Sequence, residues 1–244
     1  MEEEKEWFEE WFDTAYYHKL YNDRNFDEAE AFIKVLSKHM NLSPNSYILD
    51  LACGKGRHAL QLNQLGYKVK GVDLSANSIQ GASKNCNENL EFSVADMREP
   101  LNEKFDAVYN LFTSFGYFNS TKENLKVLNA ISIMLKPGGK FVIDFMNCDK
   151  VIANINPQET LRKEGIDFHI SKKIENDQII KSIEFNDKNE SFKFEERVQA
   201  LTKNDFEKLI SQTDLKIEET FGDYLLSPFD NKQSDRLIII GSKQ

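Results

Sequence analysis

The most constraining feature of this sequence is a glycine-rich turn between two apolar segments. Residues 47–52 read Y-I-L-D-L-A, residues 53–59 read C-G-K-G-R-H-A, and a second apolar segment at 68–73 ends in Asp73. A strand, a glycine turn, a helix and a second strand ending in an acidic residue form a unit that binds nucleotide-like ligands. The glycines allow close approach of a ligand, and the helix N-terminus attracts an anion. We expect Asp73 to accept hydrogen bonds from a ribose diol.

Apolar segments of strand length alternate with helical patterns through most of the chain. We expect strands at about 47–52, 68–73, 90–94, 105–111, 140–146, 215–219 and 236–241, and a late helix at about 204–212. The residues K-P-G-G at 136–139 are typical of a turn before the fifth strand. Alternation of this kind predicts an α/β fold with a doubly wound, mostly parallel, Rossmann-like sheet of seven strands.

Residues 148–203 break this alternation and predict an antiparallel β insertion of about three strands. Apolar and polar residues alternate there at 161–174, 178–186 and 191–201, and polar spacers separate these segments. The N-terminal residues instead show helical spacing, with an aromatic stripe at Trp7, Phe8, Trp11 and Phe12. We therefore expect three parts: N-terminal helices at 1–40, a Rossmann-like domain at 41–147 and 204–244, and the insertion at 148–203.

The composition narrows the classes of function. The net charge of −9 argues against a broad nucleic-acid surface, because neutralising phosphates takes clustered Lys and Arg. No apolar run approaches the ~18 residues that span a membrane, and the start M-E-E-E-K-E lacks the features of a signal peptide. Cys53, Cys86 and Cys148 lack the spacing of metal ligands, so we expect no metal site and a cytoplasmic protein without a membrane partner.

Two nucleotide-like cofactors are compatible with the glycine turn. Residues 54–59 fit the G-x-G-x-x-A pattern of dinucleotide enzymes, so an NAD-dependent oxidoreductase is one interpretation. The sequence also resembles class I S-adenosylmethionine-dependent methyltransferases. The resemblance rests on D-L-A-C-G-K-G at 50–56, Asp73, A-D-M at 95–97, L-K-P-G-G-K-F-V-I-D at 135–144 and the two terminal strands. Several motifs in the correct order favour the methyltransferase interpretation.

The resemblance implies S-adenosylmethionine as the cofactor and gives each matching residue a role. Asp50 would lie near the methionine end of the cofactor, Asp73 would bind the ribose hydroxyls, and Asp96 with Met97 would hold the adenine. The N-terminal helices would form a lid over the cofactor. The implied cofactor-binding residues are Asp50, Ala52, Gly54, Gly56, Asp73, Leu74, Asp96, Met97, Leu111, Tyr21 and Arg24.

The acidic residues also have structural interpretations that the sequence leaves open. Asp50 could cap the helix after the glycine turn, and Asp73 could be a strand-end turn residue. Asp96 could serve as the ion-pair partner of Arg98. Their joint arrangement along successive strand ends favours the cofactor site over these alternatives.

The resemblance also points to a small-molecule acceptor, methylated on N or O by in-line transfer. Similar insertions roof the acceptor pocket in small-molecule methyltransferases. The segment N-L-F-T-S-F-G-Y-F at 110–118 lacks the prolines of enzymes that methylate DNA amino groups. The sequence also lacks the Pro-Cys pair of cytosine-C5 enzymes. We therefore expect no DNA substrate. We expect Tyr17, Phe115 and Tyr117 to bind the acceptor, and His18 and Tyr117 are the candidate catalytic residues.

Several alternatives remain for the activity and the assembly. The aromatic residues at 112–118 could equally pack in the core, and Tyr17 and Tyr21 could belong to a surface helix. An RNA- or protein-directed methyltransferase is a second candidate, although the acidic charge makes RNA a poor fit. A cofactor-binding sensor or subunit without catalysis is a third candidate. The oligomeric state is expected to be a monomer or a homodimer.

Overall fold

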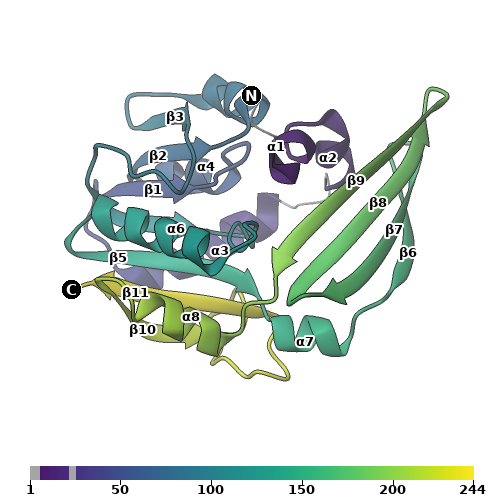
Figure 1. Cartoon of the computed structure of the whole chain (residues 1–244). Coiled ribbons are helices and arrows are strands. Elements are labelled where there is room, and N and C mark those ends of the chain that lie inside the picture. The colour runs from purple at the N-terminus through teal and green to yellow at the C-terminus, as the bar shows by residue number, and fades with distance from the viewer. Residues whose placement is uncertain (1–5, 22–25) are drawn as a thin grey trace, which may run out of the picture.

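The computed structural model describes residues 6–21 and 26–244, and its larger β-sheet has the strand order β10-β11-β5-β4-β1-β2-β3 (Figure 1). β1 pairs in parallel with β2 and β4, β2 with β3, and β4 with β5. β11 is antiparallel to both β5 and β10. This mostly parallel seven-stranded sheet confirms the predicted fold class. Its strands are β1 (Tyr47–Leu51), β2 (Lys68–Asp73), β3 (Leu90–Val94), β4 (Phe105–Asn110), β5 (Leu135–Met146), β10 (Leu215–Phe221) and β11 (Arg236–Lys243).

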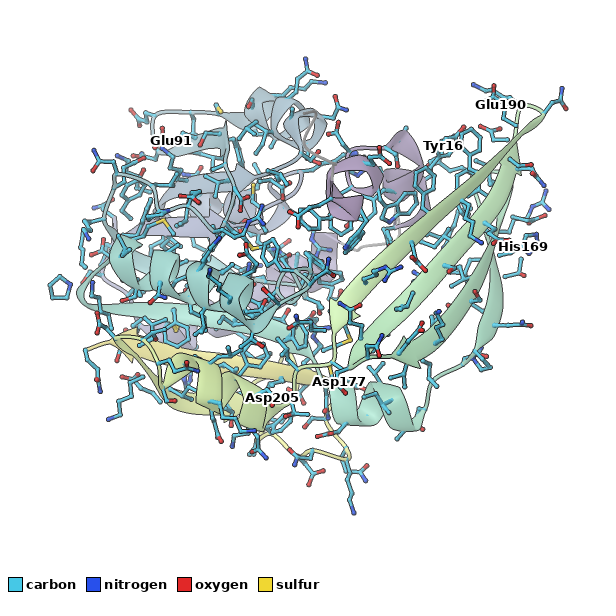
Figure 2. The ribbon with its side chains drawn as sticks, viewed as in Figure 1. Tyr16, Glu91, His169, Asp177, Glu190 and Asp205 are labelled. Carbon is cyan, nitrogen blue, oxygen red and sulfur yellow. The ribbon has the colours of Figure 1, made fainter. Side chains whose placement is uncertain are left out.

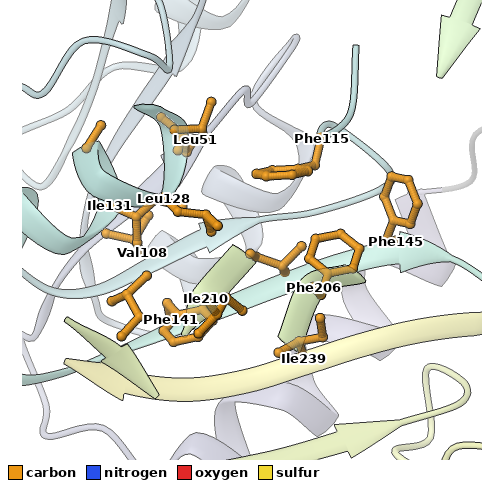
Figure 3. Close-up of a cluster of buried hydrophobic side chains, with 14 of the residues drawn as sticks. Leu51, Val108, Phe115, Leu128, Ile131, Phe141, Phe145, Phe206, Ile210 and Ile239 are labelled. Carbon is orange, nitrogen blue, oxygen red and sulfur yellow. The ribbon is translucent and has the colours of Figure 1, made fainter. Parts of the chain in front are cut away.

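Helices cover both faces of this sheet because alternate strand residues point to opposite faces. On one face, Leu51 and Val108 pack in a buried cluster with α6 (Thr121–Met134) and α8 (Lys203–Ile210), part of which Figure 3 shows. On the other face, Ile48 packs in a second cluster with α3 (Phe26–Met40) and α4 (Arg57–Gln64). The short elements α5 (Ala76–Ala82) and η1 (Ser83–Asn85) follow β2. This packing fixes the carboxyl ends of the parallel strands relative to one another.

The residues at 136–139 belong to strand β5, so the prediction of a turn before that strand is wrong in this detail. β5 pairs with β4 at Leu135 opposite Phe105 and again at Lys140 opposite Ala107, and the register shifts between the two pairs. Four residues of β5 therefore bulge opposite Asp106. A bulge of this kind keeps a strand continuous while it bends the chain, which a turn-like composition does not distinguish from a true turn.

The insertion contains α7 (Cys148–Ala153) and a separate antiparallel sheet of strands β6 (Gln158–Lys163), β7 (Ile166–Glu175), β8 (Gln178–Asp187) and β9 (Glu190–Gln199). The sequence predicts about three strands there, with one strand at 161–174. That prediction is wrong by one strand, because Glu164 and Gly165 take φ of +47° and +82° and turn the chain into a hairpin. The insertion sheet stands beside the carboxyl edge of the larger sheet (Figure 1).

Two short N-terminal helices, α1 (Trp7–Trp11) and α2 (Ala15–Leu20), lie between the larger sheet and the insertion (Figure 1). Trp11 and Leu20 are buried in one cluster with Phe168 and other residues of the insertion. Tyr16 lies beside the insertion (Figure 2), where its hydroxyl donates to Asp187 at 2.9 Å. No helix within residues 6–21 and 26–244 is long and apolar enough to cross a membrane.

Candidate functional site

A cavity of about 550 Å³ opens where the carboxyl ends of β1, β2 and β4 meet the N-terminal helices. Ligands of open parallel sheets bind at this edge, because the connections there leave a crevice. The sequence-predicted residues that line the cavity are Tyr17, His18, Tyr21, Ala52, Gly54, Asp73, Leu74, Asp96, Met97, Leu111 and Tyr117. Asp50, Gly56 and Phe115 do not line it, and Arg24 lies outside the described residues.

The glycine loop after β1 owes its shape to three residues with a left-handed backbone. Ala52, Gly54 and Gly56 have φ of +63°, +55° and +77°. A Cβ added to Gly54 would meet no protein atom within 4 Å, whereas a Cβ on Gly56 would lie 2.6 Å from the ring of Phe92. Gly54 therefore leaves room for a ligand at the cavity, and Gly56 leaves room for a side chain of the sheet.

Asp73 ends β2 at the wall of the cavity. Its two carboxylate oxygens accept hydrogen bonds from the backbone N–H groups of Gly54 at 2.8 Å and Ser75 at 2.9 Å. Burial raises the pKa of Asp73, although these backbone hydrogen bonds act in the opposite direction. Each carboxylate oxygen can accept more than one hydrogen bond, so the group keeps capacity for ligand hydroxyls.

Asp50 on β1 lies beneath the glycine loop and not at the surface of the cavity. Its side chain is 1% exposed and accepts a hydrogen bond from the backbone N–H of Ala59, in the first turn of α4, at 3.0 Å. Burial raises the pKa of Asp50 to about 7. In this position Asp50 satisfies a backbone donor at the start of α4, which corresponds to the structural interpretation of this residue.

Asp96 lines the cavity and is also the ion-pair partner of Arg98. The Nε of Arg98 donates to Oδ1 at 3.1 Å and to Oδ2 at 2.9 Å, and its Nη2 donates to Oδ2 at 2.6 Å. Burial alone would raise the pKa of Asp96, but the hydrogen bonds from Arg98 outweigh it and hold the pKa below its usual value. Arg98 also pairs with Glu6 and Glu123, each at 3.1 Å, so the ionised Asp96 belongs to a network.

The N-terminal helices are tied to the cavity edge by Asp13, a residue that the sequence reasoning missed. Its carboxylate accepts from the hydroxyl of Ser75 at 2.5 Å, and from the backbone N–H of Asn77 at 3.0 Å. The side-chain amide of Asn77 donates to the same carboxylate at 2.7 Å. Asp13 thereby satisfies donors at the start of α5, and no local sequence signal distinguishes it from other surface acids.

The same helices are tied to the insertion by Glu196 on β9. The indole N–H of Trp11 donates to Glu196 at 2.7 Å, and the hydroxyl of Tyr21 donates to it at 2.6 Å. The ring of Trp11 also stacks on Phe194 with 4.5 Å between the ring centroids. The N-terminal segment therefore contacts the glycine-loop domain on one side and the insertion on the other, and the cavity lies on the side of the glycine loop, where no residue of the insertion lines it.

The segment after β4 brings aromatic side chains to the cavity. Phe112, Tyr117 and Phe118 line it, and the hydroxyl of Tyr117 donates to the backbone carbonyl of Thr113 at 2.6 Å. Phe115 instead is 0% exposed and packs in the core with its ring centroid 5.4 Å from that of Phe206 (Figure 3). The core interpretation therefore describes Phe115, whereas its neighbours face the cavity.

Other lining residues were not predicted from the sequence to be site residues. Arg57 and His58 reach the cavity from the first turn of α4, and their place directly after the glycine turn is the signal that would have found them. Arg57 also lies over the ring of Phe112, with its guanidinium carbon 4.8 Å from the centroid. The remaining lining residues are Phe8, Phe12, Asp13, Cys53, Lys55, Ser75, Ala76, Ser78, Ala95 and Ser114.

The residues present fit the cofactor that the resemblance implies. A carboxylate at Asp73 suits a ribose diol, Leu74 and Met97 offer apolar surface for an adenine ring, and the space over Gly54 admits a chain close to the backbone. The cavity volume falls within the range of about 300–1,000 Å³ that holds small ligands. Within the described ranges, 6–21 and 26–244, no group of three or more His, Cys, Asp and Glu side chains could hold a metal ion.

Comparisons with known proteins agree with this chemistry. A family model described as a methyltransferase domain matches residues 42–212. A glycine/sarcosine N-methyltransferase of Parasynechococcus marenigrum is 30% identical over 138 residues, which cover 54% of this chain and 48% of that protein. The dTDP-3-amino-3,4,6-trideoxy-alpha-D-glucopyranose N,N-dimethyltransferase of Streptomyces venezuelae is 29% identical over 130 residues, which cover 52% and 54%. The chain therefore spans about half the length of these relatives.

The fold also matches a solved structure along nearly the whole chain. An S-adenosylmethionine-dependent methyltransferase from Clostridium acetobutylicum superposes with a TM-score of 0.78 and 22% sequence identity, covering 93% of this chain and 96% of that one. At this identity the likeness concerns the fold, including the insertion. It agrees with the α/β fold class of the larger sheet.

Proposed function

This chain belongs to the class I S-adenosylmethionine-dependent methyltransferase family, and we propose that it transfers the methyl group to the nitrogen of a small-molecule amine. The methyl donor of the family is S-adenosylmethionine, whose sulfonium supplies an already activated methyl group. The observation that carries the proposal is the cavity that Asp73 and Gly54 share with the aromatic segment after β4. One end of this cavity suits a nucleoside, and the other end, lined by aromatic side chains, suits a small organic molecule.

The residues expected from the sequence to bind the cofactor have the following roles in this proposal. Asp73 binds the ribose hydroxyls with the lone pairs that Gly54 and Ser75 leave available. Asp96, kept ionised by Arg98, accepts from the exocyclic amine of adenine, while Leu74 and Met97 pack on the rings. Ala52, Gly54 and Leu111 border the methionine end. Asp50 and Gly56 act indirectly, because they hold the glycine loop that the cofactor contacts.

The N-terminal helices enclose the acceptor in this proposal, and the insertion holds these helices. Tyr17, His18 and Tyr21 line the cavity from the helices, and Glu196 of the insertion holds Trp11 and Tyr21 in place. Residues 6–21 would thus act as a lid, and residues 148–203 would support that lid without lining the cavity. Enclosure excludes water and aligns the acceptor with the sulfonium, which is the main task of the protein when the methyl group is already activated.

An amine acceptor suits the protonation chemistry of the cavity. The hydroxyl of Tyr117 donates a hydrogen bond to the carbonyl of Thr113, and a protonated hydroxyl is a poor general base. A neutral amine needs no base before it attacks the methyl group, whereas an alcohol or phenol does. The two curated relatives described above are named as N-methyltransferases of small molecules, which supports the same acceptor class.

The test is the partition of label from S-adenosylmethionine carrying a labelled methyl group. The purified chain is incubated with a bacterial small-molecule extract, with total RNA and with total protein, and the label in each fraction is counted. We expect label in the small-molecule fraction, as a methyl group on an amine that stays attached after acid treatment. Label in RNA or protein alone would show that the acceptor is a macromolecule and would contradict the proposed acceptor class. Binding of S-adenosylhomocysteine without any labelled product would indicate a sensor instead.

A further inference from the structure

Two successive residues after β4 have a backbone conformation that their side chains disfavour. Phe112 and Thr113 have φ of +62° and +61°, in the left-handed region. Residues other than glycine, asparagine and aspartate rarely adopt this region, and a β-branched residue such as threonine is a genuine outlier there. Such strain persists only where neighbouring groups hold the backbone, and it concentrates at functional sites. Phe112 lines the cavity, so the strained turn forms part of its wall.

A buried ion pair holds this turn from outside the cavity. Asp144 on β5 is 1% exposed, and its carboxylate accepts from the backbone N–H of Phe112 at 2.8 Å. Its backbone carbonyl accepts from the N–H of Thr113, also at 2.8 Å. Arg236 on β11 donates from Nε to Asp144 at 2.8 Å and from Nη2 to the hydroxyl of Thr113 at 3.0 Å. Both left-handed residues are therefore bonded to the same pair.

The left-handed turn at residues 112–113 also orients side chains that face the acceptor end of the cavity. The carbonyl of Thr113 accepts from the hydroxyl of Tyr117 at 2.6 Å, so the direction of that carbonyl fixes the hydroxyl. The ring of Phe112 lies close to two guanidinium groups, with the guanidinium carbon of Arg57 at 4.8 Å and that of Arg236 at 5.8 Å from its centroid. Neither Asp144 nor Arg236 lines the cavity itself.

We propose that Asp144 and Arg236 are positioning residues for methyl transfer, which act by holding Phe112 and Thr113 in the left-handed turn. This inference rests on the function proposed above and extends it to two residues that do not touch the cavity. The pair fixes where Phe112 and Tyr117 meet the acceptor, so its loss affects alignment for transfer more than it affects cofactor binding. A small displacement of these side chains from the in-line geometry costs rate even when the cofactor is bound normally.

Three substitutions at Thr113 separate this role from ordinary packing. Thr113→Ser keeps the hydroxyl that Arg236 binds and removes the branch that opposes a positive φ. Thr113→Val keeps the shape and the strain but removes the hydroxyl. Thr113→Gly removes the hydroxyl together with the strain, because glycine adopts a positive φ freely. The proposal predicts that the rate of transfer follows the order of serine, then glycine, then valine.

The rate measured is the initial transfer of labelled methyl groups from S-adenosylmethionine into the small-molecule extract, at one fixed dilution for all variants. Thr113→Val should lower that rate about tenfold or more, the scale of one lost hydrogen bond to a charged group. Thr113→Ser should stay within about twofold of the parent by the same reasoning, because its hydrogen bond persists. Affinity for S-adenosylhomocysteine, measured by calorimetry, should be unchanged in all three variants. Thr113→Val should melt below the parent, because Arg236 loses a hydrogen-bond partner, so the rates are compared at a temperature at which every variant is folded.

A rescue experiment tests the link to Arg236. Arg236→Lys keeps the charge beside Asp144 but loses the fork that reaches Thr113. Its rate should fall, and adding Thr113→Gly to it should recover part of that loss, since glycine needs no restraint to hold the turn. A double variant slower than Arg236→Lys alone, or a Thr113→Val variant as fast as the parent, would overturn the proposal.

A structural measurement keeps this inference distinct from the proposed function. Crystals of Thr113→Val with S-adenosylhomocysteine should show residues 112–113 displaced from the left-handed region. If the parent transfers no label to any small molecule, the proposed function fails while this displacement still supports the restraint by Asp144 and Arg236. An unchanged turn in those crystals would contradict the restraint whatever the activity.

Discussion

Replacing Asp73 with alanine tests the cofactor site at its most specific contact. In the proposed complex the carboxylate of Asp73 accepts hydrogen bonds from the ribose diol, and it is held in place by the N–H groups of Gly54 and Ser75. A hydrogen bond to a charged group contributes about 1.5–3 kcal/mol. We therefore expect Asp73→Ala to weaken the binding of S-adenosylhomocysteine by roughly 10- to 150-fold. The fold should survive, because the two released N–H groups face a cavity that water can enter.

The assay is calorimetric titration of S-adenosylhomocysteine into the parent and the variant, with melting temperatures measured in parallel. Asp167→Ala is the matched control, because Asp167 is an exposed acid on β7 that pairs with Arg162 away from the cavity. The control should bind like the parent. An Asp73→Ala protein that melts like the parent and binds within twofold of its affinity would refute the reasoning, since the carboxylate would then contribute nothing to the ligand.

Three further predictions follow from individual contacts. Burial raises the pKa of Asp50 to about 7. The parent should therefore lose stability relative to Asp50→Asn as the pH rises from ~4 to 7, because the buried carboxyl must then ionise. Equal melting curves for the two proteins across that range would contradict this. Gly56→Ala should lower the melting temperature strongly, because its Cβ would lie 2.6 Å from the ring of Phe92. Gly54→Ala should mainly weaken cofactor binding. Thermal scans and calorimetric titrations of both variants test these two expectations. Glu196→Gln should speed the release of S-adenosylhomocysteine in stopped-flow traces, because Trp11 and Tyr21 lose a shared charged acceptor, and an unchanged release rate would remove Glu196 from the lid.

The sheet could be predicted from the sequence because its signals are local and repeated. Most of the parallel strands are short segments with apolar residues, and most of them are followed by a helix with an apolar face. The glycine turn and Asp73 then placed the cavity, since the carboxyl ends of parallel strands meet at one edge. The prediction missed the hairpin between β6 and β7, although R-K-E-G at 162–165 interrupts the alternation, because a single glycine between two alternating segments does not separate a turn from a bulge.

The individual site residues were harder to predict, because their roles depend on contacts between distant segments. Asp13 accepts a hydrogen bond from Ser75, which lies 62 residues further along the sequence. Phe115 and Tyr117 are two residues apart in the same aromatic segment, yet one packs in the core and the other lines the cavity. The segment leaves the regular strand at that point, so no periodicity indicates which side chain points inward.

The most direct test of the central claim is a crystal structure of this chain with S-adenosylhomocysteine. We predict that the ribose hydroxyls contact Asp73, that the adenine lies between Leu74 and Met97 beside Asp96, and that the sulfur points toward the segment that holds Phe112 and Tyr117. A ligand bound outside this cavity, or no ligand at saturating concentration, would contradict the claim that the carboxyl edge of the sheet forms the cofactor and acceptor site.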